Sequence, residues 1–186
     1  MSNEEQVILR KILKRIQVDL SDEFDRNFTR QSFFSKPWQR RKSPVSGSRS
    51  GHLLVDSGEL RRSIQGSTIN GDTLTFSSDL PYAKLHNEGG EIKVTARMKR
   101  YFWARYLETQ KRFGRKKDGS IRKTKGNVQV SSMAAFWKHM ALMKVGSTIH
   151  IPARPFLANS PEVENIIRQH VDEGMKEYID NINWTK

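Results

Sequence analysis

The sequence contains no cysteine, which excludes disulfide bonds and metal sites with thiolate ligands. It also lacks any apolar run near the roughly 18 residues that a membrane-spanning helix needs. The charged, amphipathic first stretch, residues 1–16, has no uninterrupted apolar segment of the kind that marks a signal peptide. We therefore expect a soluble protein made in the cytoplasm.

Hydrophobic residues are scarce as well. They make up 35% of the 186 residues, against about 45–50% in typical globular proteins, a figure that also counts glycine. The length suits a single domain over residues 1–186. The low hydrophobic fraction predicts that part of this domain is exposed or disordered.

The groups of side chains that catalysis or metal binding requires are missing too. The five histidines are isolated, and none forms the H-x-x-x-H spacing of a metal site. No glycine-rich phosphate loop and no G-x-S-x-G motif is present. Asp56 and Glu59 lie three residues apart beside a turn, where carboxylates more often cap a helix or face solvent. We therefore expect no enzymatic activity, no metal and no cofactor.

Positive charge, in contrast, is abundant and concentrated in one segment. Residues 96–125 hold twelve Lys and Arg side chains against two carboxylates. Their net +10, out of +13 for the chain, leaves only +3 for the remaining 156 residues. The twelve cations are Arg97, Lys99, Arg100, Arg105, Lys111, Arg112, Arg115, Lys116, Lys117, Arg122, Lys123 and Lys125.

Three interpretations of this basic segment stay open. Aromatic residues such as Tyr101, Trp103 and Tyr106 alternate with the cations, and a surface that contacts phosphates and stacks on bases uses both kinds of side chain. The segment is therefore a candidate nucleic-acid-binding arm. An acidic protein surface is a second candidate partner, because charge alone does not identify the partner. The third interpretation is a solvated insertion whose charge only keeps it soluble.

Hydrophobic periodicity predicts a long amphipathic helix near each end of the chain. The first covers about residues 3–29, with a stripe that includes Ile12 and Ile16. The second begins at Pro161, because Ser160 suits a helix cap and proline suits the first helical position. We expect the stripe of the first helix to face the core.

The segment after the first helix, residues 31–51, is predicted to be a loop because prolines, glycines and serines interrupt the periodicity. Phe33, Phe34 and Trp38 lie inside it. An exposed aromatic patch for a partner is one interpretation. We favour the other, in which these rings fix the loop to the core, because large aromatic side chains usually bury most of their surface.

A β-hairpin is predicted over residues 64–77, with Asn70-Gly71 in a type I′ turn. Ile69, Leu74 and Phe76 would share its core side.

The rest of the chain contains shorter elements around a rigid corner. Residues 150–157, HIPARPFL, hold two prolines that restrict the backbone where the last strand leads to the last helix. The other expected elements are a short helix or turn over 81–90, strands over 91–94 and 145–151, helices over 96–113 and 133–143, and a segment, 114–126, that is disordered at least in isolation.

This order of elements predicts an α+β fold. Two long amphipathic helices would pack on a small antiparallel sheet, with residues 96–143 as a basic insertion that is partly helical or disordered. The other face or the edges of the sheet would be available for assembly.

Three short motifs carry a family resemblance. They are Asp56–Ile64 (DSGELRRSI), Pro81–Gly89 (PYAxxHxxG) and Ile151–Leu157 (IPARPFL). In this order, and between two long helices, they resemble the phage virion morphogenesis or tail completion family, which is similar to the head–tail joining proteins of other tailed phages. The resemblance covers about residues 1–95 and 144–182, and the basic segment between them is longer than the resemblance implies.

The resemblance implies a structural protein of a phage or prophage. It implies a ring or collar at the neck or tail end of the virion, assembled in the cytoplasm of the bacterial host, without enzymatic activity. The implied partners are further copies of the chain and connector, neck or tail-tube proteins, with DNA as an open alternative and no membrane.

The resemblance also implies roles for ten residues in the fold or in assembly, and for each we favour the structural role. Arg154 is in addition a candidate to pair with a carboxylate of its own or a neighbouring subunit. The ten residues are Gly58, Leu60 and Arg61 at the turn into the hairpin, Tyr82, His86 and Gly89 closing the sheet, and Pro152, Arg154, Pro155 and Phe156 at the corner.

Overall fold

The computed structural model describes residues 3–41, 43–44, 51–64 and 66–184. Its helices and short antiparallel strand pairs confirm the α+β class. The chain divides into two compact units, the first comprising residues 1–39, 48–88 and 153–186 and the second residues 40–47 and 89–152. The first unit contains α1 (Asn3–Arg30), β1 (Ser32–Phe33), β2 (Lys36–Pro37), α2 (Glu59–Ser63), β3 (Thr68–Asn70), β4 (Thr73–Thr75), α3 (Ala83–Glu88) and α6 (Pro161–Trp184). The second contains β5 (Gly90–Lys93), α4 (Ala96–Lys111), α5 (Lys125–Leu142) and β6 (Thr148–Ile151).

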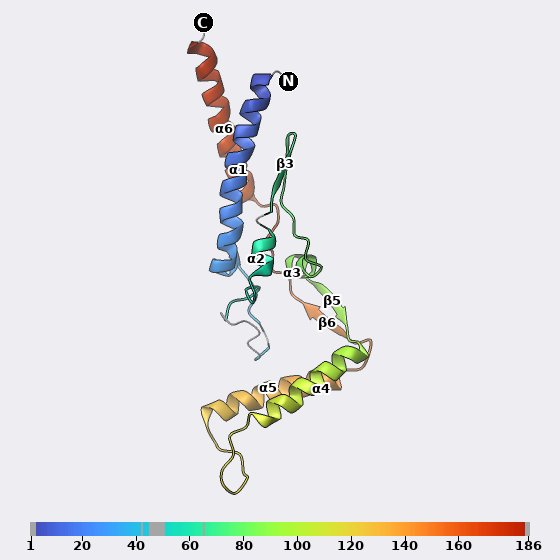
Figure 1. Cartoon of the computed structure of the whole chain (residues 1–186). Helices are drawn as coiled ribbons and strands as arrows, with labels where there is room; N and C mark the ends of the chain where they lie inside the picture. Colours follow the sequence, from blue (N-terminus) through green and yellow to red (C-terminus); the bar gives the residue numbers. More distant parts are fainter. Residues whose placement is uncertain (1–2, 42, 45–50, 65, 185–186) are drawn as a thin grey trace. The chain divides into compact units, whose positions relative to one another are not determined.

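The two long helices of the first unit, α1 and α6, pack side by side in opposite directions (Figure 1). They approach closely where Ile12 meets Gly174, since a Cβ added to this glycine would lie 2.3 Å from Ile12 Cγ1. Lys11 and Arg15 donate hydrogen bonds of 2.9 and 2.7 Å to the Glu177 carboxylate. These two bonds, the one from Arg15 first, lower the pKa of Glu177 to about 2.

The core of the first unit is built on one face of α1. Phe28 is fully buried, and its ring lies 5.6 Å from Trp38 and 5.6 Å from Phe156, measured between centroids. Phe33 and Trp38 are 7% and 6% exposed, which confirms that these aromatic residues fix the segment after α1 to the core. Phe34 is partly buried and packs against the same cluster.

The segment predicted as a loop over 31–51 begins with regular structure. Strands β1 and β2 pair antiparallel, with Ser32 opposite Pro37. Asn27 Oδ1 accepts a 2.8 Å hydrogen bond from the Phe34 amide, which fixes a residue whose φ of +48° is unusual for a large side chain. Residues 42 and 45–50 of the predicted loop lie outside the described part of the chain.

The predicted hairpin is present as β3 and β4, with Ile69 opposite Leu74. The ring of Phe76 lies 5.1 Å from Phe24 of α1, which confirms the predicted core side. The turn is shifted by one residue, because Asn70 pairs with Thr73 and leaves Gly71 and Asp72 as the loop. The predicted type I′ turn is wrong: it needs positive φ at both positions, whereas Gly71 alone has it (+61°), as in type II′.

The second unit is a short ladder joined to a pair of helices. Strands β5 and β6 pair antiparallel from Gly90 opposite Ile151 to Lys93 opposite Thr148. Helices α4 and α5 lie against each other, with the ring of Phe102 stacked on Trp137 at 6.0 Å.

The strands differ from the predicted arrangement in one respect. Within the described residues they form three separate two-stranded ladders and not one small sheet. The chain between β4 and β5 forms α3, and its polar groups bind the segment after β6 and not a neighbouring strand.

The basic segment is also more regular than predicted. Helix α5 begins at Lys125, eight residues before the predicted start, because the Thr124 side chain caps it by accepting from the Asn127 amide at 3.2 Å. The segment 114–126, predicted as disordered in isolation, contains an antiparallel bridge between Arg115 and Ile121.

Candidate functional site

The second and third sequence motifs meet in the first unit, where α3 contacts the chain that follows β6. The side chain of Asn87 makes three hydrogen bonds there. Its Oδ1 accepts from the amides of Phe156 and Leu157 at 2.9 and 3.0 Å, and its Nδ2 donates to the Leu157 carbonyl at 2.7 Å. The Arg154 amide also donates to the His86 carbonyl at 2.8 Å. Asn87 therefore supplies the backbone contacts that a paired strand would otherwise provide.

The proline corner is buried from its other side by α1 and the segment after it. Phe156 is 1% exposed, and Trp38 Nε1 donates a 2.6 Å hydrogen bond to the Pro155 carbonyl. Arg154 is 8% exposed, and its Nε donates to the Gln39 carbonyl at 3.1 Å. These three corner residues are thus held inside the first unit.

His86 lies half-buried on α3, with the ring of Tyr82 6.0 Å away. Burial lowers the pKa of His86 below its usual value, and the positive charge of Arg154 lowers it further. A histidine in this position is favoured in its neutral form, so it is suited to packing and not to carrying charge.

The first motif lies beside α1. Gly58 precedes α2 with a φ of +77°, a backbone conformation that favours glycine. Leu60 is 4% exposed in the core. Arg61 binds both carboxylate oxygens of Asp25 on α1, and these hydrogen bonds raise the pKa of Arg61.

Gly89 and Pro152 lie where the chain passes between the two units. Gly89 follows α3 with a φ of +75°, the left-handed conformation that commonly ends a helix. All of the ten motif residues except Pro152 therefore have a local contact or backbone conformation described above. Tyr82, 37% exposed, is the most accessible of the three in the second motif.

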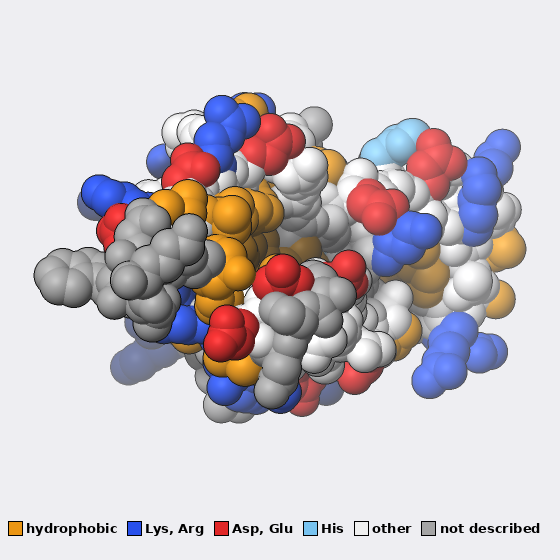
Figure 2. Space-filling model, turned by 90° about the horizontal axis from the view of Figure 1, so that it is seen from above, with side chains coloured by type: hydrophobic (Ala, Val, Ile, Leu, Met, Phe, Trp, Pro, Cys, Tyr) orange, Lys and Arg blue, Asp and Glu red, His pale blue; other side chains and the backbone are white. Residues whose placement is uncertain are grey.

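A different surface is exposed on α6. Ile167, Val171, Met175 and Ile179 are 37%, 39%, 47% and 52% exposed. They recur every four residues and form a continuous row, which we call the α6 stripe. Figure 2 shows hydrophobic side chains exposed between the two helix ends of the α1–α6 pair. The same helix also has a core-facing side, where Val163 is 6% exposed, so α6 is amphipathic as predicted but leaves part of its apolar surface uncovered.

The twelve cations of the basic segment belong to the second unit. The aromatic residues among them serve largely to pack its helices: Phe102 is 7% exposed, and Tyr101 contacts Trp137 with ring centroids 6.0 Å apart. Tyr101 and Trp103 remain 53% and 39% exposed. Ten of the twelve cations are exposed as well, whereas Lys99 and Arg105 are partly buried.

Two asparagines that hold irregular segments in place were not among the residues predicted from the sequence. Asn87 fixes the proline corner, and Asn127 fixes the loop between α4 and α5.

In the part of the chain that the structure describes, no group of three or more His, Asp or Glu residues could hold a metal ion. No helix of that part is long and apolar enough to cross a membrane.

Comparison with known proteins gives one match. The sequence model of the phage virion morphogenesis family matches residues 3–176 of the chain. The matched range includes the basic segment that the motifs left outside the resemblance. No curated protein and no solved structure matches the chain.

Proposed function

Because this chain belongs to the phage virion morphogenesis family, we propose that it is a non-enzymatic structural protein that acts in tail completion or head–tail joining. In this role several copies form a ring or collar in the host cytoplasm. The ring then contacts connector, neck or tail-tube proteins, and the protein becomes part of the virion.

The observation that carries self-assembly is the α6 stripe. Four neighbouring hydrophobic side chains stay exposed on a helix whose other face is buried against α1. Contiguous exposed hydrophobic surface of this kind marks interaction sites. Burying such side chains removes roughly 25 cal/mol of unfavourable free energy per Å² of apolar surface.

The expected occupant of the α6 stripe is a second copy of the chain. The exposed residues beside the stripe carry both signs of charge: Arg168 and Lys176 are cations, and Asp172 and Glu173 are anions. A mixed rim can form opposite-charge pairs when a copy of the same protein docks against it.

The role is tested in the phage or prophage that encodes the protein. Val171→Glu introduces a charge into the α6 stripe, and Val18→Glu makes the same change on α1, outside the stripe, at a residue 59% exposed. Electron microscopy of lysates should show unjoined heads and tails for Val171→Glu and complete particles for Val18→Glu. Normal numbers of complete particles with a folded Val171→Glu protein would exclude the stripe as the assembly surface.

A further inference from the structure

The connection between α4 and α5 is an ordered, hydrogen-bonded loop. At its base, the Asn127 side chain is 8% exposed and bridges the two ends of the loop. Its Oδ1 accepts from the Gly114 amide at 2.9 Å, while its Nδ2 donates to the carbonyls of Gly114 and Arg122 at 2.8 and 2.6 Å. The Arg122 amide completes the closure with a 2.9 Å bond to the Gly114 carbonyl.

A tight turn closes the other end of the loop. The Lys116 amide donates to the Ser120 carbonyl at 2.8 Å, and Gly119 takes a φ of +82°. Asp118 accepts from the amide and the hydroxyl of Ser120 at 2.9 and 2.7 Å. These bonds lower the pKa of Asp118. The loop's own carboxylate is therefore engaged in forming the turn.

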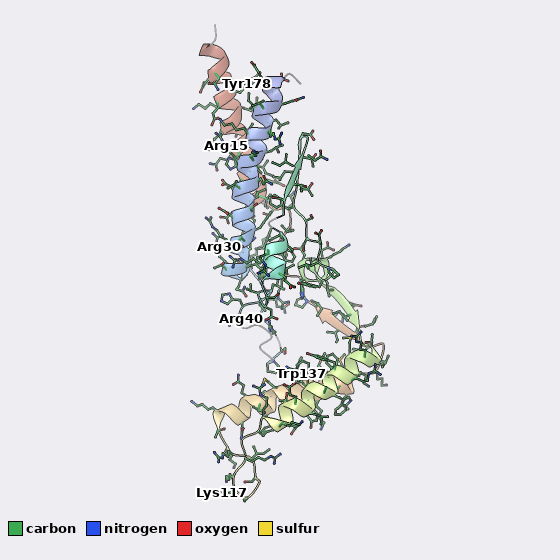
Figure 3. All side chains as sticks on the ribbon, in the orientation of Figure 1. Arg15, Arg30, Arg40, Lys117, Trp137 and Tyr178 are labelled. Atoms are coloured by element: carbon green, nitrogen blue, oxygen red, sulfur yellow. The ribbon has the colours of Figure 1, made fainter. Side chains whose placement is uncertain are left out.

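The loop and its two flanking residues, 111–125, display a dense group of cations. All eight are exposed, and within the described residues none is ion-paired to a carboxylate. Figure 3 shows Lys117 at the far end of the loop from the two helices. We call this group the tip cations: Lys111, Arg112, Arg115, Lys116, Lys117, Arg122, Lys123 and Lys125.

We infer that the tip cations bind the phosphate backbone of nucleic acid. An acidic protein surface fits less well, because protein interfaces are depleted in lysine and are centred on buried apolar or aromatic anchors. Five of the eight tip cations are lysines, and the loop holds only two large hydrophobic residues, the partly buried Phe113 at its base and Ile121. A polyphosphate backbone, in contrast, requires only closely spaced cations.

The structure also specifies the mode of binding. No aromatic residue lies between Gly114 and Lys125, and Phe113, the one aromatic residue of the loop, is partly buried, so the loop contacts phosphates and does not stack on bases. Phosphate contacts carry no sequence information, and they suit duplex and single-stranded nucleic acid alike. Because Asn127 holds the loop in place before binding, less conformational entropy is lost in the complex. This inference is independent of the α6 stripe, since the loop can bind nucleic acid whether or not the protein forms a ring.

The test measures binding of the full chain to a fluorescein-labelled 20-base-pair duplex of mixed sequence, by fluorescence anisotropy over a salt series. One variant replaces four tip cations by glutamine, and a matched control replaces four exposed cations elsewhere, so both lose one arginine and three lysines. The tip variant carries K116Q, K117Q, R122Q and K123Q, and the control carries R10Q, K14Q, K84Q and K144Q.

The tip variant should bind at least ten-fold more weakly at 0.1 M salt, with the control within about three-fold of the unmodified protein. It should also reduce the slope of log K against log salt by about three to four, since each lost phosphate contact reduces it by about one. Absence of DNA binding by the unmodified protein, or equal losses in both variants, would overturn the inference.

Two further measurements test the partner and the ordered loop. Asn127→Ala keeps every charge and should weaken DNA binding several-fold, and unchanged affinity would overturn the role of Asn127. Poly-glutamate at equal charge concentration should displace the duplex poorly. Displacement as effective as that by unlabelled DNA would instead assign the loop to an acidic protein.

Discussion

At the scale of single residues, amide side chains hold the irregular parts of this protein. Asn87 binds the proline corner, Asn127 closes the α4–α5 loop, and Asn27 fixes the turn between β1 and β2. Gln31 holds the segment at Leu53, whose amide donates a 2.5 Å hydrogen bond to Gln31 Oε1. An amide side chain carries both a donor and an acceptor. It can therefore replace the partner that a backbone segment lacks outside a helix or sheet.

Asn87→Ala should lower the free energy of unfolding by about 2 to 4 kcal/mol, because it leaves two amides and one carbonyl of the corner without their partner. Asn87→Asp should cost less, since it keeps the acceptor for both amides. Denaturant unfolding followed by circular dichroism measures both values. A loss below about 0.5 kcal/mol for Asn87→Ala would show that the corner is held by other contacts.

His86 predicts a pH dependence of stability. Its pKa is lowered in the folded protein, so below about pH 6.5, the ordinary value for histidine, the unfolded chain binds the proton more readily. The free energy of unfolding should therefore be highest above pH 6.5, where His86 is neutral in both states. It should fall as the pH drops below this value.

The matched variants are His86→Gln and His139→Gln, the latter at an exposed position of α5. His86→Gln should flatten the fall in the denaturation midpoint between pH 7 and pH 5, whereas His139→Gln should leave it as in the unmodified protein. Identical pH profiles for all three proteins would exclude His86 as the titrating group.

The roles of individual residues could be predicted from the sequence only where a role restricts which amino acid can fill it. Leu60 and Phe156 are large and hydrophobic in a chain with few such residues, and both are buried. Gly58 and Gly89 take the positive φ that glycine allows. Asn87 was not predictable, because an asparagine that binds distant backbone looks the same in sequence as one that faces solvent.

At the scale of elements, the long helices were predictable and the strand arrangement was not. Helices α1 and α6 carry a hydrophobic period over more than twenty residues, and such a signal survives local irregularity. The strands have two to four residues each, too few for a pattern to show which strands pair in one sheet. The type II′ turn differed from the predicted one because the register moved by one residue.

The α1–α6 contact yields a test of close packing. Gly174→Ala should destabilise the protein by about 1 to 3 kcal/mol, although alanine favours helices, because its Cβ would overlap Ile12. Gly126→Ala in α5 is the matched control: its Cβ would lie 3.9 Å from the nearest atom, Thr124 Oγ1, so alanine should stabilise by up to about 1 kcal/mol. Thermal unfolding of both variants measures the difference.

Relief of the overlap identifies its cause. Adding Ile12→Val to Gly174→Ala removes the methyl group whose carbon, Cδ1, lies 2.4 Å from the added Cβ, so the double variant should recover part of the loss. Equal stability of Gly174→Ala and the unmodified protein would mean that α1 and α6 separate at little cost.

At the scale of the whole molecule, the two compact units carry different surfaces. The first unit holds the motif residues from Gly58 to His86, the part of the proline corner from Arg154 to Leu157, and the α6 stripe. The second holds the tip cations. The family could be predicted from three motifs of the chain, because they combine prolines, glycines and buried residues in a fixed order. The α6 stripe could not, since its residues share the helical period of the core.

The most direct test of self-assembly is the solution mass of the purified protein, measured by light scattering at low and high salt. We predict a discrete oligomer that persists at high salt, because hydrophobic burial is not screened as ion pairs are. Val171→Glu should reduce it to a monomer, and Val18→Glu should leave it intact. A monomer at every salt concentration, or an oligomer that Val171→Glu leaves intact, would contradict assembly through the α6 stripe.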